Sequence, residues 1–241
     1  MIKLRNMLIT AIAIVGLSSS AWAGTTSIGI VGSMLDVEAT GTETDKLTAA
    51  GANVADTSTR KKSTSADTFT GSLFAEFTSD TRWPMTFGFE YTPGTADISG
   101  KLSRSDTETS ITGTTTQVSN TVVRTAQADA TNFSTVYFEA PIWGMLYARA
   151  GVSNLDIDYV TTTDGSNGGN YSDNLSLSGT NYGVGLKSTN DSGMLWKLTY
   201  EESNYDTFTL NSKNNSVAAN SNTIKGDAST SAIRFSLAKS F

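Results

Sequence analysis

Eight stretches of this chain alternate apolar with polar or small side chains at a period of two, the pattern of β-strands whose two faces meet different surroundings. The clearest covers residues 85–91, where Phe87 and Phe89 share one face and Thr86 and Glu90 share the other. The pattern leaves the faces of residues 136–140 undecided. The predicted strands are residues 27–35, 69–77, 85–91, 136–140, 145–152, 182–187, 194–200 and 231–241.

The connections between these strands alternate strictly between long and short. Four polar segments, residues 36–67, 93–130, 161–179 and 206–230, are predicted as long loops, and three short turns join the other strand ends. A strand of ~10 residues tilted by ~40° covers roughly 25 Å, the height of the lipid-facing band of a membrane barrel. A soluble β-sandwich is the alternative, but it has no reason to place every long loop at one end.

The start of the chain has the organisation of a secretory signal peptide. A short basic region precedes an apolar run over residues 7–17, and a small-x-small triplet at residues 21–23 forms a cleavage site before Gly24. The apolar run is too short to span ~30 Å of hydrocarbon. We therefore predict a cleaved leader over residues 1–23 and one exported domain over residues 24–241.

The last predicted strand ends on an aromatic residue. Phe235, Leu237 and Phe241 share one face, which resembles the C-terminal signature of bacterial outer-membrane β-barrels. In that family the assembly machinery reads the final residues, so the resemblance implies that these three residues are an assembly signal. Lys239 departs from the family pattern, which favours an aromatic residue there, although a lysine can snorkel its amine to the interface. An ordinary edge strand is the alternative interpretation.

Aromatic residues lie near both ends of the predicted strands. Tryptophans lie in or just beyond the short turns, and tyrosines lie beside the long loops. Two bands of amphipathic rings suit two water–lipid interfaces, so we predict an aromatic girdle, with chance placement or a soluble core as the alternative. The predicted girdle residues are Trp83, Trp143, Trp196, Tyr91, Tyr159, Tyr182 and Tyr205.

Together these features predict an all-β fold, an eight-stranded antiparallel up-and-down transmembrane β-barrel with long extracellular loops. The architecture of residues 24–241 resembles that of small outer-membrane proteins of the OmpX, opacity-protein and OmpA-barrel type. The resemblance implies location and topology rather than activity, because it carries no catalytic motif. It implies a monomer in contact with outer-membrane lipid and lipopolysaccharide, with the barrel assembly machinery as the partner of the C-terminal strand.

The faces predicted to point inward carry four acidic and four basic side chains. An eight-stranded barrel is just wide enough for side chains to fill, and unpaired charges inside it would be costly. We therefore predict a neutral, paired network that acts as a structural polar plug, with a gated ion path as the alternative. The predicted network is Glu76, Glu90, Glu139, Arg149, Lys187, Lys197, Glu201 and Arg234.

The composition argues against an enzyme. The chain has no His and no Cys, so a Ser/His catalytic pair is impossible and the usual nitrogen and sulfur metal ligands are missing. Without Lys3 and Arg5, 15 basic and 23 acidic residues remain, and this net charge of −8 disfavours nucleic-acid binding. We expect no cofactor and no metal; residues 164–173 are rich in Gly, Asn and Asp but lack the spacing of an EF-hand calcium loop.

Three roles remain open for such a barrel. The first is a structural or surface-interaction role with a filled lumen, the second a narrow diffusion pore, and the third an adhesin whose Thr/Ser/Asn-rich loops bind an unknown surface ligand. The basic cluster at residues 60–62 suits lipopolysaccharide phosphates, with a solvated loop tip as the alternative. No loop carries a motif that identifies a ligand.

Overall fold

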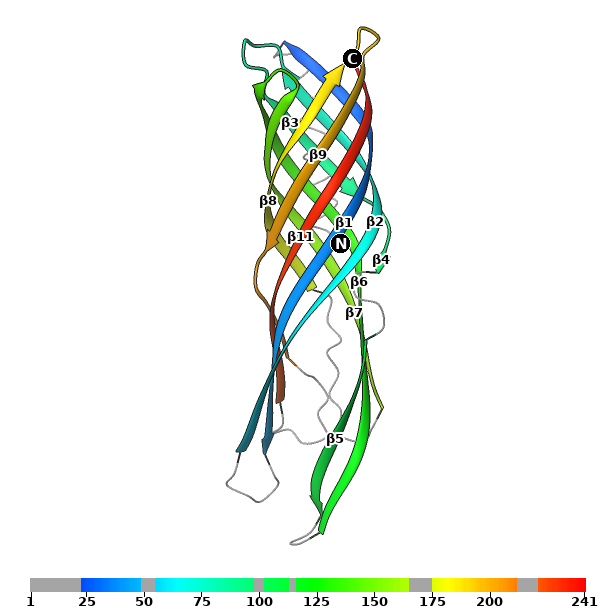
Figure 1. Cartoon of the computed structure of the whole chain (residues 1–241), viewed down its shortest axis with the longest axis vertical. Coiled ribbons are helices and arrows are strands. Elements are labelled where there is room, and N and C mark those ends of the chain that lie inside the picture. Colours follow the sequence, from blue (N-terminus) through cyan, green and yellow to red (C-terminus); the bar gives the residue numbers. More distant parts are fainter. Residues whose placement is uncertain (1–22, 49–54, 98–101, 113–115, 165–174, 212–220) are drawn as a thin grey trace.

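The structure is a computed structural model that describes residues 23–48, 55–97, 102–112, 116–164, 175–211 and 221–241. Within these residues eleven strands form one antiparallel sheet, which curls into an elongated barrel (Figure 1). No helix in this part of the chain is long and apolar enough to cross a membrane. The predicted leader lies outside the described residues, apart from Ala23.

Eight strands close the barrel and follow one another around it in chain order. They are β1 (Gly24–Thr48), β2 (Ala55–Ser79), β3 (Thr86–Thr92), β6 (Thr116–Trp143), β7 (Leu146–Asp164), β8 (Leu175–Thr189), β9 (Met194–Tyr205) and β11 (Ser221–Ser240). Pairing between β1 and β11, from Ser27↔Ser240 to Lys46↔Ser221, completes the ring. The predicted eight-stranded antiparallel up-and-down barrel is therefore confirmed.

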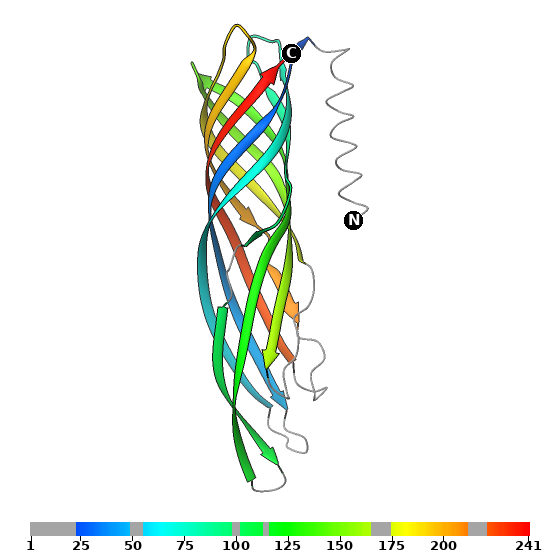
Figure 2. The same ribbon diagram turned by 90° about the vertical axis from the view of Figure 1, so that its right-hand side faces the viewer.

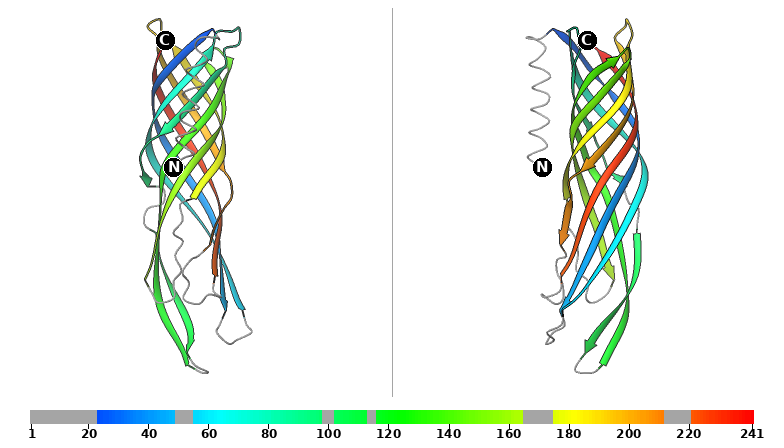
Figure 3. Two further views of the ribbon diagram at one scale, coloured as in Figure 1. Left: turned by 180° about the vertical axis from the view of Figure 1, so that it is seen from behind. Right: turned by 60° about the vertical axis from the view of Figure 1, so that its left-hand side comes forward.

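Three shorter strands continue the wall beyond this ring. β4 (Ala96–Asp97) and β5 (Leu102–Thr112) pair with β6, and β10 (Phe208–Asn211) pairs with β11. They follow β3 and β9 along the chain, so the wall reaches different heights around the barrel (Figure 3).

The short turns and the carboxyl terminus lie at one end of the barrel, and the long hairpins lie at the other (Figure 2). Gly144 (φ 57°) turns the chain between β6 and β7, and Gly193 (φ 77°) does so between β8 and β9. Glycine adopts this left-handed backbone without a Cβ clash. The terminal residue is tied into the same end, because the Phe241 N–H donates to the Thr26 carbonyl oxygen at 2.9 Å. We call these the turn end and the hairpin end.

The segments predicted as long loops are largely strand. β1 and β2 continue as one hairpin to the pair Thr48↔Ala55, and β5 and β6 pair as far as Thr112↔Thr116. The turn predicted at residues 141–144 begins only after Trp143. The predicted loop extents that the structure corrects are residues 36–67, 93–130, 161–179 and 206–230.

These segments form strands without an apolar face because they are rich in threonine, whose β-branched side chain favours extended backbone. A membrane-spanning strand needs ~9–11 residues. β1 and β2 have 25 residues each and β6 has 28, so more than half of each strand is beyond that need. Where both faces of a strand meet water, apolar and polar side chains no longer alternate. The backbone still forms strand pairs there, but the sequence pattern that predicts a strand is absent.

Along the barrel wall, side chains alternate between lumen and exterior. On β9 every second residue from Leu195 to Tyr205 is buried, and the residues between are exposed or half-buried. On β6, whose faces the sequence left undecided, Val136 faces out at 42% exposure while Tyr137 and Glu139 are buried. The core of this protein is therefore the barrel lumen.

Candidate functional site

Eight charged side chains gather in the lumen, each on the inward face of its strand. β2, β3, β6 and β9 supply the glutamates, and β7, β8, β9 and β11 supply the cations. Seven of the side chains are at most 4% exposed, and that of Lys187 is 20% exposed. The residues are Glu76, Glu90, Glu139, Arg149, Lys187, Lys197, Glu201 and Arg234.

Four of these residues form a closed ring of alternating charge. Arg149 Nη2 lies 3.2 Å from Glu90 Oε2, and Arg149 Nε lies 2.6 Å from Glu201 Oε2. Arg234 closes the ring, with Nη1 2.8 Å from Glu201 Oε1 and Nη2 bonded to Glu90 Oε1. Each carboxylate therefore bridges two guanidinium groups, although Arg149 Nε and Glu201 Oε2 meet as an ion pair and not as a hydrogen bond. We call these four residues the arginine–glutamate ring.

The other four residues form a chain beside this ring. Lys197 Nζ lies 2.6 Å from Glu76 Oε2 and 2.9 Å from Glu139 Oε1. Lys187 Nζ lies 3.1 Å from Glu139 Oε2. Arg149 Nη1 lies 3.7 Å from Glu139 Oε1 and links the chain to the ring. The formal charges cancel, and this balance offsets much of the cost of removing so many charges from water.

Two buried tyrosines fill space among the charges. The Tyr137 hydroxyl donates to Glu76 Oε2 at 2.7 Å, and the Arg149 guanidinium lies 3.6 Å from the centre of the Tyr137 ring. A cation over an aromatic face is electrostatically favourable. Tyr147 is fully buried, and its hydroxyl bonds to the hydroxyl of Thr199. The centre of the network is therefore packed with rings as well as with ion pairs.

The sequence prediction does not include Tyr137 and Tyr147 in the network. Each faces a glycine on the neighbouring strand, since Gly88 pairs with Tyr137 and Gly185 pairs with Tyr147. A Cβ built on Gly88 would lie 2.1 Å from Tyr137 Cζ, and one on Gly185 would lie 2.7 Å from Tyr147 Cζ. A glycine opposite an aromatic residue on the inward faces is the sequence signal that points to these two rings.

An apolar cluster replaces the charges toward the hairpin end of the lumen. On β7, Leu155 follows Arg149 along the inward face, and on β9, Tyr205 follows Glu201. The buried members are Leu155, Ile157, Leu177 and Tyr205, with Ala130, Phe133, Leu175, Phe208 and Ala228 packed against them. The lumen therefore has an ionic layer and, on its hairpin side, an apolar layer.

The prediction that Tyr205 belongs to the aromatic girdle is wrong. Tyr205 is 7% exposed and packs in the apolar cluster. The inward phase of β9, which Lys197 and Glu201 also follow, runs unbroken to Tyr205 and turns its ring into the lumen. The position of Tyr205 beside a predicted loop does not place its ring at the interface, because β9 continues as a barrel strand to Tyr205.

The outer face of the barrel carries a band of exposed apolar side chains. On β11, Ile233, Phe235 and Leu237 are 57%, 49% and 42% exposed, on either side of the buried Arg234. The stretch from Ile233 to Phe241 covers roughly 23 Å at ~3.3 Å per residue and ~40° tilt, close to the ~25 Å of a lipid-facing band. Other exposed members are Ile28, Ile30, Met34, Phe69, Leu73, Phe87, Val152, Val184 and Leu198.

This band stops at carboxylates on the hairpin side. Along the outward face of β1, Met34 is followed by Asp36, and along that of β2, Phe69 gives way to Asp67. Asp36 and Asp67 lie directly opposite each other in the sheet, one outward position beyond the pair Met34↔Phe69. The change from apolar to acidic side chains therefore marks a border of the band.

Tyrosines occupy the hairpin-side border to different degrees. Tyr182 is 51% exposed, and its hydroxyl donates to Glu202 Oε2 at 2.6 Å. Tyr91 is half-buried, and its hydroxyl donates to Asn132 Oδ1 at 3.0 Å. Tyr159 lies in β7, and its side chain is outside the described part of the chain.

The turn-side border carries the tryptophans. Trp83 and Trp143 are 62% and 84% exposed in or beside the short turns, and Trp196 is 36% exposed just beyond one. Phe241, at the same end, is 75% exposed. These large rings point outward where the apolar band meets the turns, which suits a water–lipid interface.

The C-terminal strand holds its three predicted signal residues on the outer face. Phe235, Leu237 and Phe241 are all exposed there. Lys239 does not extend freely, because its amine donates to the carbonyl oxygen of Ser192 in the turn between β8 and β9.

The remaining sequence candidates give no further site. Residues 165–174, which cover most of the Gly/Asn/Asp-rich segment, are outside the described residues. Across the part of the chain that is described, no group of three or more His, Cys, Asp or Glu could hold a metal ion. The basic residues 60–62 lie in β2 rather than at a loop tip, and they pair with residues 41–43 of β1.

Three solved outer-membrane proteins are among the structures to which this chain is similar. It is similar to the outer membrane protein OprG from Pseudomonas aeruginosa, with 11% identity, a TM-score of 0.43, and coverage of 91% of this chain and 97% of that chain. The outer membrane protease OmpT from Escherichia coli gives 5% identity, a TM-score of 0.44, and coverage of 93% and 100%. The attachment invasion locus protein Ail of Yersinia pestis gives 12% identity, a TM-score of 0.35, and coverage of 88% and 99%.

No protein-family model matches the sequence, and no curated protein matches it at a significant level. All three TM-scores lie below 0.5, so the assignment of the barrel rests on the strand pairing within this chain.

Proposed function

We propose that this chain is an integral outer-membrane β-barrel with a lumen closed by its paired charges, and that it serves as a rigid mount for polar hairpins on the cell surface. The charge network carries the proposal: four carboxylates and four cations all find partners within 3.7 Å of one another. Such a network leaves no uncompensated charge to hold an ion path open.

The packing around the network supports closure rather than conduction. A water-filled pore needs hydrated side chains, whereas Tyr137 and Tyr147 are at most 2% exposed among the charges. The apolar cluster lies on the hairpin side of the network and adds a second layer that disfavours water. An eight-stranded barrel has room for side chains and little more, so the packed ionic layer suffices to block it.

The outward band supports the membrane location. Pairing between neighbouring strands satisfies the backbone around most of the apolar band, and the exposed apolar side chains meet lipid favourably. The predicted leader supplies the export route, and Phe235, Leu237 and Phe241 are the residues that we expect the barrel assembly machinery to read. Lipid and lipopolysaccharide are then the immediate surroundings of a monomeric barrel.

The hairpins favour a surface-interaction role as the second part of the proposal. β1 with β2, flanked by β11 as far as Lys46↔Ser221, and β5 with β6 extend beyond the apolar band (Figure 1). Paired strands of this length present a fixed polar surface more rigidly than loops do. An adhesin-like role follows if one of these arms recognises a partner on another cell or surface.

Single-channel recording in planar bilayers tests the closed lumen. We expect the purified, refolded protein to give no stable open channel, with heat-modifiable gel migration as the control that the barrel is folded. The double variant Y137A/R149A removes the stacked pair at the centre of the network and should produce discrete openings. Stable openings of the unmodified protein would favour the pore instead.

Cell fractionation tests the location independently. We expect a protein that begins at Gly24 in the outer-membrane fraction, and recovery as a soluble periplasmic protein contradicts the proposal. Deletion of Phe241 should lower the yield of folded barrel and raise its protease sensitivity. Unchanged yield would show that the terminal residue is not an assembly signal.

A further inference from the structure

The wall of the barrel is interrupted on the hairpin side of β3. Hydrogen-bonded pairing between β2 and β3 ends at Leu73↔Tyr91, and the next segment, β4, pairs with β6 instead of β2. Pro93 has no N–H to donate to β2, and Gly94, at φ 100°, turns the chain. Beyond this point β2 has β1 as its only partner strand among the described residues.

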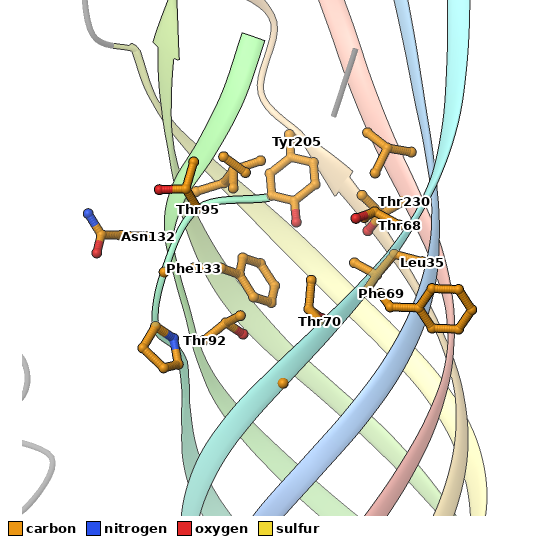
Figure 4. A pocket seen from close by; sticks show the side chains of 16 residues that line it. Leu35, Thr68, Phe69, Thr70, Thr92, Thr95, Asn132, Phe133, Tyr205 and Thr230 are labelled. Carbon is orange, nitrogen blue, oxygen red and sulfur yellow. The ribbon is translucent and has the colours of Figure 1, made fainter. Parts of the chain in front are cut away.

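A cavity of about 180 Å³ lies at this interruption (Figure 4). Phe133, Leu155 and Tyr205 line it from the lumen, and Leu35 lines it from β1. In Figure 4 the rings of Phe133 and Tyr205 lie on the inner side of the cavity, and the ring of Phe69 points away from it. None of the lining residues carries a charge.

The cavity meets both faces of the wall. Leu155 and Tyr205 are each 7% exposed and belong to the apolar cluster of the lumen. Phe69, which borders the same cavity, is 78% exposed on the outer face. The cavity therefore lies between β2 and residues 93–95, away from the ionic layer, and borders residues of both faces of the wall.

The position of the cavity along the barrel axis indicates whether lipid or water lies next to it. Phe69 pairs with Met34, the last apolar outward pair before Asp36 and Asp67. The cavity thus lies at the hairpin-side border of the apolar band, since Phe69 belongs to the band whereas Val37 and Thr230 pair just beyond the row of Asp36. Acyl chains meet their head groups at this level. Water and charged solutes are disfavoured at this depth.

We propose that this cavity is a binding site for part of one acyl chain of a lipid in the outer leaflet, inserted from the bilayer between β2 and residues 93–95. The lining carries no charge, and Leu35, Phe133 and Leu155, set among threonines, offer apolar contacts to a hydrocarbon chain. An apolar cavity of ~150 Å³ is known to hold a benzene ring. The site therefore takes a segment of a chain, not a whole lipid. Because lipid tails are themselves apolar, the gain comes from filling a void whose lining atoms lack contact partners. This inference rests on the proposed membrane location.

Photolabelling in vesicles tests the site. The probe is a phospholipid with a diazirine at the end of one acyl chain, and peptide mass spectrometry locates the labelled residues. We expect labels on Phe133, Leu155 or Tyr205 within the lumen, in addition to labels on outward residues such as Leu237. A fatty acid with the same diazirine, added to the solution, is the second arm and tests a free amphiphile as the source.

Two tryptophan substitutions sharpen the test. Thr70→Trp fills the cavity from the inward face of β2 and should abolish labelling of the lumen residues. Gly32→Trp is the matched control, because Gly32 faces out in open space on the adjacent strand and does not line the cavity. It should leave the lumen labels unchanged.

The outcomes separate this inference from the proposed function. Lipid labels confined to Leu237 and other outward residues overturn the acyl-chain site while the membrane location stands. Lumen labels from the fatty acid alone overturn the bilayer as the source, and lumen labels that persist in Thr70→Trp overturn this cavity as the route. Absence of label on Leu237 itself contradicts the membrane location.

Discussion

The membrane half and the hairpin half of this barrel use the same strands in two different environments. In the membrane half, from the turn end to the pair Met34↔Phe69, many outward side chains are apolar, and the inward side chains include the eight buried charges. In the hairpin half, from Asp36 and Asp67 onward, both faces of β1 and β2 are dominated by polar or small residues. Strands persist across the border although the amphipathic pattern does not, so backbone pairing and side-chain patterning are separable.

The comparison also separates two energetic regimes. Charges in the membrane half are withdrawn from water and depend on one another, so removing one partner of a buried pair costs ~3–5 kcal/mol. Among the described charges of the hairpin half, Glu38 and Asp67 are exposed, and surface substitutions are usually worth within ~0.5 kcal/mol. Mutations matched across the border therefore measure how far the two halves differ.

The largest effect is expected for Arg234→Ala, which removes one corner of the arginine–glutamate ring. Glu90 and Glu201 each lose a buried partner, so unfolding in urea from lipid vesicles should show a loss of ~3–5 kcal/mol. Lys239→Ala, at an exposed cation of the same strand, should change the unfolding free energy by under ~1 kcal/mol. Similar values for the two variants would contradict a dry lumen.

A charge placed on the lipid face should cost nearly as much, for a different reason. Leu237→Arg puts a guanidinium group into the apolar band, with an expected cost of ~2–4 kcal/mol in the same unfolding assay. Ser231→Arg lies on the same face of β11 in the row of Asp36, beyond the border, and should cost ~0–1 kcal/mol. Equal costs at the two positions would show that the border is misplaced.

Packing inside the ionic layer gives a smaller effect. Gly88→Ala sets a methyl group against Tyr137, whose ring cannot easily yield because it is held by Glu76 and Arg149. Overpacking of this kind typically costs ~1–3 kcal/mol. Gly32→Ala, in open space on the outer face, is the control. Equal unfolding free energies for the two alanine variants would show that Glu76 and Arg149 do not hold the Tyr137 ring in place.

The smallest effect is expected for Glu38→Ala in the hairpin half. Glu38 is exposed on β1 and lies opposite serines on both neighbouring strands, so its loss should change stability by within ~0.5 kcal/mol. The same substitution at Glu76, on the adjacent strand in the membrane half, leaves Lys197 with Glu139 alone and should cost several-fold more. A large cost at Glu38 would mean that the hairpins support the barrel instead of merely extending it.

The strands of the membrane half could be predicted from the sequence because lipid on one face and the lumen on the other impose a period-two pattern of side chains. Lipid demands apolar side chains at every second residue, and Ile233, Phe235 and Leu237 show that demand directly. Charges between them, such as Arg234, must then face the lumen. Which cation meets which carboxylate could not be read, because β2, β6 and β9 meet only in three dimensions.

The hairpin half could not be predicted in the same way. Threonine-rich segments with polar residues on both faces look like loops when alternation is the only signal. Tyr205 was placed on the lipid side for this reason, since β9 was expected to end before it. The cavity at Pro93 depends on where pairing between β2 and β3 stops, which no local pattern records.

A double-mutant cycle on Arg234 and Glu201 tests most directly whether the lumen charges depend on one another. The single variants Arg234→Ala and Glu201→Gln and the double variant are unfolded in urea from the same lipid vesicles. In a dry, paired ring the double variant is neutral again and retains the contact between Arg149 and Glu90, so it should cost at least ~1 kcal/mol less than the sum of the singles. Costs that add to within ~0.5 kcal/mol would show that the charges are independently hydrated and contradict the closed lumen.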